Sequence, residues 1–154
     1  MDHNKRGWIT ALAAGAAAVW GTRHAHAAAF PGDEATHKIV YQINHADPEH
    51  IEHILNSISA VLGKYVDDVS IAIVAFGPGI HLLATQPGRP IPDNLRQRVK
   101  GMADNYGVKL IACGNTMKSL KWERKDIIKQ AEIEQVGAAA LMELQEKGYA
   151  YIAW

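Results

Sequence analysis

The sequence is poor in several residue types, and each scarcity excludes a class of protein. Cys113 is the single cysteine among 154 residues, so no disulfide can form within the chain. Basic and acidic residues number 16 each, which leaves no basic excess for binding nucleic acid. The apolar run from Trp8 to Trp20 is shorter than the roughly 20 residues that span a bilayer. We therefore expect no disulfide scaffold, no nucleic-acid partner and no membrane span in the mature protein.

Several enzyme motifs are also missing. The sequence has no phosphate-binding loop, no Gly-x-Gly-x-x-Gly after the first apolar strand and no Gly-x-Ser-x-Gly turn. His50 and His53 would share a helix face with His45 nearby, but their spacing matches no recognised metal signature. Nucleotide hydrolysis and serine-hydrolase chemistry are unsupported, and neither a cofactor nor a metal site is predicted.

Residues 1–27 have the three parts of a signal peptide. Lys5 and Arg6 precede an apolar, alanine-rich middle, and a small-x-small cleavage site ends at Ala27. The Lys-Arg pair resembles a variant twin-arginine signal, and a general-secretion signal is the alternative. These features predict a bacterial protein exported to the periplasm. Residues 28–37 contain proline and glycine and are predicted to form a flexible lead-in.

Removal of residues 1–27 changes the composition of the protein. It takes away three basic residues and one acidic residue, leaving 13 and 15 and a net charge of −2. The rest of the chain is long enough for one domain with its own core, over residues 38–154. A lone thiol is unusual in an oxidising compartment, where structural cysteines normally pair. Cys113 is therefore expected to be either well buried or chemically used.

Short apolar runs alternate with amphipathic stretches after residue 38. Strands are predicted at 38–44, 69–76, 108–113, 131–136 and 149–152. Helices are predicted from Pro48 to Gly63, from Asp93 to Gly107 and from 137 to 147. This alternation is typical of an α/β fold, here a three-layer sandwich with a central, mostly parallel five-stranded sheet.

The topology of such a sheet leads to a predicted site. One chain reversal would place the first and third strands side by side, so that the loop at Asn44 and His45 and the thiol of Cys113 share a crevice. His81 follows the turn at 77–79 and either borders this crevice or packs in a loop. Tyr149 and Tyr151 alternate along the last strand and are predicted to face one side, as a subunit interface.

Cys113 ends a buried strand and is followed by a helix start. Unsatisfied N–H groups at that start, from Gly114 to Thr116, would favour a thiolate and stabilise sulfur anions. Asn115 and Thr116 also offer side-chain hydrogen bonds, although plain helix capping would use the same residues. The alternative interpretation is that Cys113 is a small buried hydrophobe ending a core strand.

Residues 38–153 resemble the DsrE/DsrF-like family, which has the YchN-like fold. The matching segments are Lys38-Ile39-Val40-Tyr41, Ala75-Phe76-Gly77-Pro78-Gly79-Ile80 with Leu82-Leu83, Gly107-Val108, Ala112-Cys113-Gly114-Asn115-Thr116-Met117, and Leu144-Gln145-Glu146-Lys147-Gly148-Tyr149. The resemblance is to the single-domain members more than to the sulfur-relay subunits.

This resemblance implies a mainly parallel α/β domain that assembles as trimers or hexamers. It also implies a function, because some members carry sulfur as a persulfide on a cysteine that follows a central strand, and Cys113 occupies the matching place. Those relay subunits act in the cytoplasm, whereas this chain has the pattern of an exported protein. Fold transfers better than function within such a group.

The predicted function is that of an exported persulfide carrier or thiol-redox protein. Cys113 would be the reactive group, with His45 as its acid–base neighbour, and a sulfur donor or acceptor protein would be the partner. Substrate-binding positions are predicted at Asn44, Gly77, Gly79, Gly114, Asn115 and Thr116. The alternative is a non-catalytic oligomeric module that binds a small ligand or partner and keeps Cys113 buried.

Overall fold

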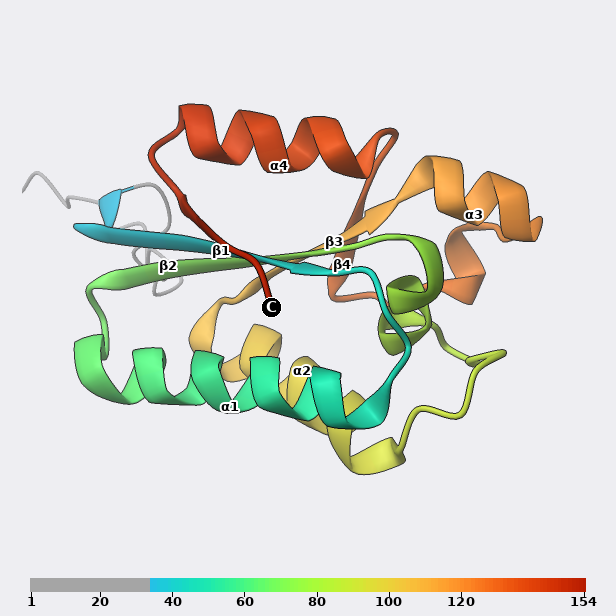
Figure 1. Ribbon diagram of the computed structural model, residues 1–154, viewed down its shortest axis with the longest axis horizontal. Coiled ribbons are helices and arrows are strands. Elements are labelled where there is room, and N and C mark those ends of the chain that lie inside the picture. The colour runs from blue at the N-terminus through green and yellow to red at the C-terminus, as the bar shows by residue number, and fades with distance from the viewer. Residues whose placement is uncertain (1–33) are drawn as a thin grey trace, which may run out of the picture.

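Five parallel strands form one sheet in the order β4-β3-β2-β1-β5 (Figure 1). The computed structural model describes residues 34–154, so the predicted signal peptide lies outside the described residues. The strands are β1 (His37–Ile43), β2 (Val69–Ala75), β3 (Lys109–Cys113), β4 (Ala131–Glu134) and β5 (Ala150–Ile152). The predicted α/β class and the five-stranded sheet are confirmed, and every pairing in the sheet is parallel.

Helices cover both faces of the sheet and give the predicted three layers. Helices α1 (Pro48–Tyr65) and α2 (Asp93–Tyr106) lie on one face, and α4 (Gly137–Glu146) lies on the other (Figure 1). The short α3 (Gly114–Leu120) continues directly from β3. Two 3₁₀ helices, η2 (Gly77–Leu83) and η3 (Arg124–Asp126), complete the described elements. Within residues 34–154, no helix has both the length and the apolar character needed to cross a membrane.

Helix α1 begins where the sequence predicts and ends later. The Asp47 carboxylate accepts a hydrogen bond of 2.8 Å from the His50 N–H, and Pro48 occupies the first turn. Its buried stripe comprises Ile51, Ile54, Leu55, Ile58 and Leu62. Gly63 was the predicted end, but the helix continues to Tyr65 because Gly63 keeps helical geometry and Val66, at φ 50°, turns the chain instead.

The core is divided by the sheet into a large and a small part. All seven residues of the central strand β2 are buried. The larger cluster lies between the sheet and helices α1 and α2. The smaller cluster lies between the sheet and α4, and it includes Ile111 of β3. Successive side chains of a strand point to opposite faces, so Cys113, two residues after Ile111, faces the α4 layer.

The predicted pairing of the first and third strands is wrong. β2 lies between β1 and β3, and the second neighbour of β1 is β5. The chain adds β2, β3 and β4 in one direction, with α1 and α2 on a single face. It reverses only at α4, which returns the chain to the far side of β1.

Tyr149 also differs from its predicted place at a subunit surface. It precedes β5, is 3% exposed, and its hydroxyl lies 2.6 Å from the Ser70 hydroxyl and accepts a 3.2 Å bond from Lys109 Nζ. Tyr151 is exposed, and its hydroxyl donates to the Gln42 side chain at 2.7 Å. A buried tyrosine whose hydroxyl has partners behaves as a core residue, so Tyr149 belongs to the α4 layer.

Candidate functional site

The thiol of Cys113 lies at the carboxyl end of β3, at the junction with α3. Its residue is 6% exposed and the thiol is free. Cys113 keeps an extended backbone, at φ −75° and ψ 116°, and Gly114 begins the helix immediately after it. This strand-to-helix junction is the one predicted from the sequence. It places the sulfur where the N–H groups of the first turn of α3 converge.

A second helix start also points at the sulfur. The N–H of Gly137, the first residue of α4, donates a hydrogen bond of 3.3 Å to Cys113 Sγ. A Cβ atom at Gly137 would lie 3.1 Å from Cys113 Cβ and 3.2 Å from Phe76 Cδ1, both closer than ordinary contacts. Glycine therefore lets α4 begin against the thiol. The partial positive charge at this helix end stabilises a thiolate there.

These contacts lower the pKa of the Cys113 thiol. Burial is the largest single influence and raises the pKa, since it disfavours the charged form. The N–H and hydroxyl of Thr116, the N–H of Gly137 and the N–H of Asn115 act in the opposite direction. Together they outweigh burial, so the pKa of Cys113 falls below its ordinary value. A buried thiol that ionises more readily than a free one is prepared for nucleophilic chemistry.

Thr116 connects the thiol to the turn after β2. Its Oγ1 accepts a hydrogen bond of 3.0 Å from the N–H of Gly77, at the start of η2. A hydroxyl that accepts at its oxygen still has its own proton to donate, and this proton is what favours the thiolate form of Cys113. Thr116 is thus a hydrogen-bond partner of the sulfur as well as a residue of the first helical turn.

Gly114 and Asn115, two of the predicted substrate-binding residues, lie against Gln135, in the segment before α4. The N–H of Asn115 donates to the Gln135 carbonyl at 3.0 Å, and its side-chain oxygen accepts from Gln135 Nε2 at 2.7 Å. A Cβ atom at Gly114 would lie 3.2 Å from the Cα of Gln135. Both residues hold α3 against the segment that leads into α4. They therefore position the N–H of Gly137 above the sulfur.

The glycines of the 77–79 turn pack against the end of β1. Gly77 has φ 52°, and its Cβ position would lie 3.7 Å from the Asn44 carbonyl oxygen. A Cβ atom at Gly79 would overlap the Ile43 carbonyl, so that position requires glycine. This packing brings Asn44, Gly77 and Thr116 to one end of the sheet with Cys113.

His45 is the predicted residue that the structure does not bring to Cys113. Its side chain is exposed, and its ring meets His50 of α1 edge-on, with centroids 5.4 Å apart. β2 separates the strand that precedes His45 from the strand that ends at Cys113. The groups that set the pKa of Cys113 come from α3 and α4 instead.

Gly137 and Gln135 are site residues that sequence reasoning missed. Gly137 was identified only as the start of a helix, 24 residues after Cys113. The direction in which α4 leaves β4 depends on tertiary packing, which no local motif records. The one available signal was local. Gly137 begins a helix without the serine, threonine or aspartate that usually precedes a helix start.

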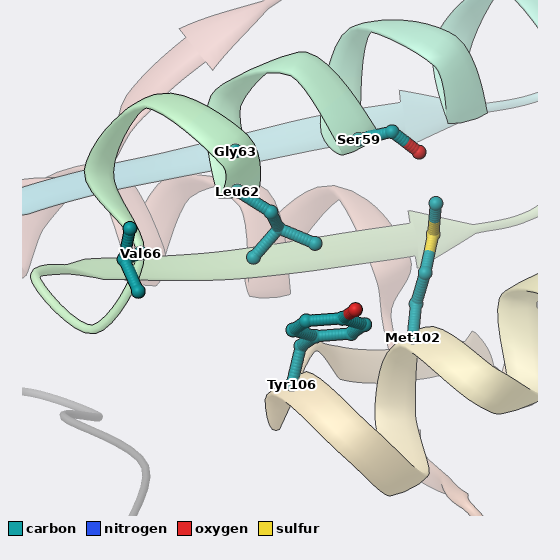
Figure 2. A pocket seen from close by; sticks show the side chains of 6 residues that line it. All are labelled: Ser59, Leu62, Gly63, Val66, Met102 and Tyr106. Atoms are coloured by element: carbon teal, nitrogen blue, oxygen red, sulfur yellow. The ribbon is translucent and has the colours of Figure 1, made fainter.

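Two hollows of similar size lie at opposite ends of the strands. One, of about 320 Å³, borders Thr116 and is lined by Gly77, Pro78, His81, Arg89, Thr116, Ser119 and Leu120. The other, also about 320 Å³, lies where α1 and α2 end, and Figure 2 shows Leu62, Met102 and Tyr106 facing one another across it. Both helices run on into the amino ends of strands, so this second hollow is remote from Cys113. Among residues 34–154, no group of three histidine, cysteine or acidic side chains is arranged to hold a metal ion.

The fold is that of a three-layer α/β protein with a parallel sheet, and a cysteine stands at the end of one of its inner strands. A family model described as the DsrE/DsrF-like family matches residues 31–154, and the chain belongs to that family. Six chains of solved structures match it. One is the structure of a protein of unknown function, MTH1491, from Methanobacterium thermoautotrophicum. It has a TM-score of 0.65 at 20% identity and covers 75% of this chain and 97% of its own. No curated protein matches the sequence.

Proposed function

We propose that Cys113 carries sulfane sulfur as a persulfide. The observation that supports this is the set of donors around the sulfur, which lowers the pKa of the thiol although burial alone would raise it. A structural cysteine gains nothing from stabilisation of its charged form. A sulfur carrier uses it twice, once when the thiolate attacks a donor and once when the persulfide anion gives its sulfur away.

The proposed step is an exchange at sulfur. The Cys113 thiolate attacks the outer sulfur of a persulfide R–S–SH, a new S–S bond forms to Cys113, and the S–S bond of the donor breaks. R–S⁻ leaves and takes up a proton from water. The outer sulfur passes between the two thiols without an external oxidant or reductant. The N–H of Gly137 and the hydroxyl of Thr116 would stabilise the Cys113 thiolate before attack, and the persulfide anion that forms when Cys113–S–SH loses its proton.

The cellular setting forms part of the same proposal. We infer that residues 1–27 direct export and that the mature protein acts in the periplasm as a homo-oligomer. The tripartite pattern of the signal supports export. The sulfur would come from, or pass to, a partner that works in that compartment.

Intact mass spectrometry of the mature protein tests the carrier function. The native protein is treated with inorganic polysulfide, beside a Cys113→Ser variant, and then with reductant. We expect a gain of one or more sulfur atoms that the variant lacks and that reductant removes. An unchanged mass of the native protein, with modification of Cys113 only after denaturation, would rule out the proposal.

That negative result would favour a second candidate function. Cys113 is 6% exposed, so it can also be a structural residue of an oligomeric module that binds a small ligand or a partner. In that case the pocket beside Thr116 would still be occupied, while the thiol would stay inert in the native protein.

A further inference from the structure

The pocket beside Thr116 combines an apolar wall with a few polar groups. Pro78 and Leu120 provide apolar surface, and the Arg89 guanidinium, the Ser119 hydroxyl and His81 provide polar groups. Its volume of about 320 Å³ fits a small molecule. Cys113 is not itself a lining residue, but Thr116 both lines the pocket and hydrogen-bonds to the thiol, so Thr116 links the pocket to the candidate reactive group.

His81 lines this pocket and has one ring N–H without a partner among residues 34–154. It is 6% exposed, and its Nδ1 accepts a hydrogen bond of 3.1 Å from the Gly88 N–H, so the ring proton belongs on Nε2. In the same part of the chain, the one side-chain nitrogen that is both buried and unpartnered is Arg96 Nε. His81 Nε2 therefore has some exposed surface, which makes it a candidate donor to a ligand in the pocket.

The surroundings of His81 keep the ring fixed and neutral. Trp122 packs edge-on against it, with centroids 4.9 Å apart at 89°. Burial, and then the nearby charge of Arg89, lower the pKa of His81, so the ring donates from one nitrogen at neutral pH. A buried N–H beside an exposed guanidinium is an arrangement suited to an anion.

We propose that the pocket binds the carboxylate of a small thiol persulfide, the sulfur donor of Cys113. The proposal rests on the carrier function and adds the class of donor. Arg89 and His81 would hold the carboxylate, Leu120 and Pro78 would contact the carbon chain, and the persulfide end would lie toward Thr116. The Cys113 thiolate attacks the outer sulfur of ⁻OOC–R–S–SH, and ⁻OOC–R–S⁻ leaves, so charge and sulfur balance.

The test compares two donors that differ only in charge. Persulfides of 3-mercaptopropionate and of its uncharged amide, 3-mercaptopropionamide, are added to mature protein, and the rate of mass gain on Cys113 is followed against donor concentration. We expect the carboxylate donor to react about tenfold more efficiently, as a charge-assisted hydrogen bond would produce. Binding of 3-mercaptopropionate is measured separately by calorimetry, with no sulfur transfer involved.

Arg89→Gln should remove the preference by slowing the reaction with the carboxylate donor, and it should weaken the calorimetric binding. Arg89 is exposed, so the fold should tolerate this change. Lys118→Gln is the matched control, since Lys118 is an exposed cation of α3 outside the pocket lining. Equal rates for the two donors, or a preference that survives in Arg89→Gln, would overturn the proposal. Failure of both donors, with 3-mercaptopropionate still bound, would instead refute the carrier function.

Discussion

The thiol of Cys113 is subject to two opposing influences. Burial favours the neutral form, and the donors from α3 and α4 favour the thiolate and prevail. The fold therefore combines protection of the sulfur from bulk solvent with stabilisation of its anion. Thr116 contributes to this stabilisation and is itself held in place, because its hydroxyl hydrogen-bonds to the sulfur and also accepts from the Gly77 N–H.

Thr116→Val should raise the pKa of Cys113. Valine has the same shape and lacks the hydroxyl, so the thiolate loses a donor and the Gly77 N–H loses its acceptor. The rate of alkylation of Cys113 by iodoacetamide, measured against pH, should shift to higher pH. The free energy of unfolding should fall by about 1–2 kcal/mol, the cost of a polar group without a partner. Thr116→Ser keeps the hydroxyl and should retain the wild-type profile.

The same pKa shift makes stability depend on pH. The pKa of Cys113 is lower in the folded than in the unfolded chain, so the folded state binds fewer protons between the two values. The stabilising effect is complete above the unfolded-state pKa and disappears as the pH falls through the folded-state pKa. In Thr116→Val this alkaline gain in stability should be smaller.

At the scale of elements, the starts of α3 and α4 meet at one sulfur. α3 follows Cys113 directly, and α4 reaches it after β4, with Asn115 and Gln135 joining the two approaches. Gly137 permits the close contact of α4. The position of a whole helix thus depends on the absence of one methyl group.

Gly137→Ala should slow the reaction of Cys113 and destabilise the fold. The added Cβ would crowd Cys113 and Phe76 and push the Gly137 N–H away from the sulfur. Overpacking costs about 1–3 kcal/mol, which exceeds the gain of about 0.5–1 kcal/mol from replacing glycine in a helix. Alkylation rates and denaturant unfolding measure the two effects.

Gly63→Ala is the matched control for that change. A Cβ atom at Gly63 of α1 would meet nothing within 4 Å. The same substitution there should stabilise the protein by about 0.5–1 kcal/mol and leave the thiol unaffected. If both variants behaved alike, the contact of α4 with the sulfur would not govern its reactivity.

The positions of the helices and strands along the sequence were more predictable than their arrangement in space. Apolar runs and helix signals identify β2 and α1 because burial and capping leave local marks. Examples are the segment Val69–Ala75, which is apolar except for Ser70, and the pair Asp47-Pro48. The junction of Cys113 with α3 is local as well, and it was predicted. Strand order is set by long-range packing, so the position of β2 between β1 and β3 was missed. The contact of Gly137 with the sulfur was missed for the same reason.

At the scale of the molecule, the outer strands of the sheet carry exposed apolar side chains. Large apolar side chains are exposed on or just after the outer strands β4 and β5, namely Ile133, Val136, Tyr151 and Trp154. β4 and β5 each also leave one edge unpaired within the described sheet. Apolar surface and open edges both favour contact with another subunit.

We expect the mature protein to form a trimer or a hexamer. Light scattering coupled to size-exclusion chromatography should give three or six times the mass of the 28–154 chain, with the value maintained on dilution to micromolar concentration. A monomer at all concentrations would contradict this assembly.

Cleavage of the signal peptide is tested separately. Mass spectrometry of protein recovered from the periplasm should show Ala28 as the first residue, and a retained Met1 would contradict cleavage.

The pairing of β1 with β5 has a consequence for folding. These are the first and last strands of the described residues, yet they lie side by side, with Ile39 opposite Ala150. Strands β1 to β4 can align with one another before β5 docks, and one side of β1 stays open until it does. Such distant pairing is slow to form, because the long loop between the partners must close first. Docking of β5 is therefore expected to be a late step of folding, and until then β1 presents an open edge to other chains.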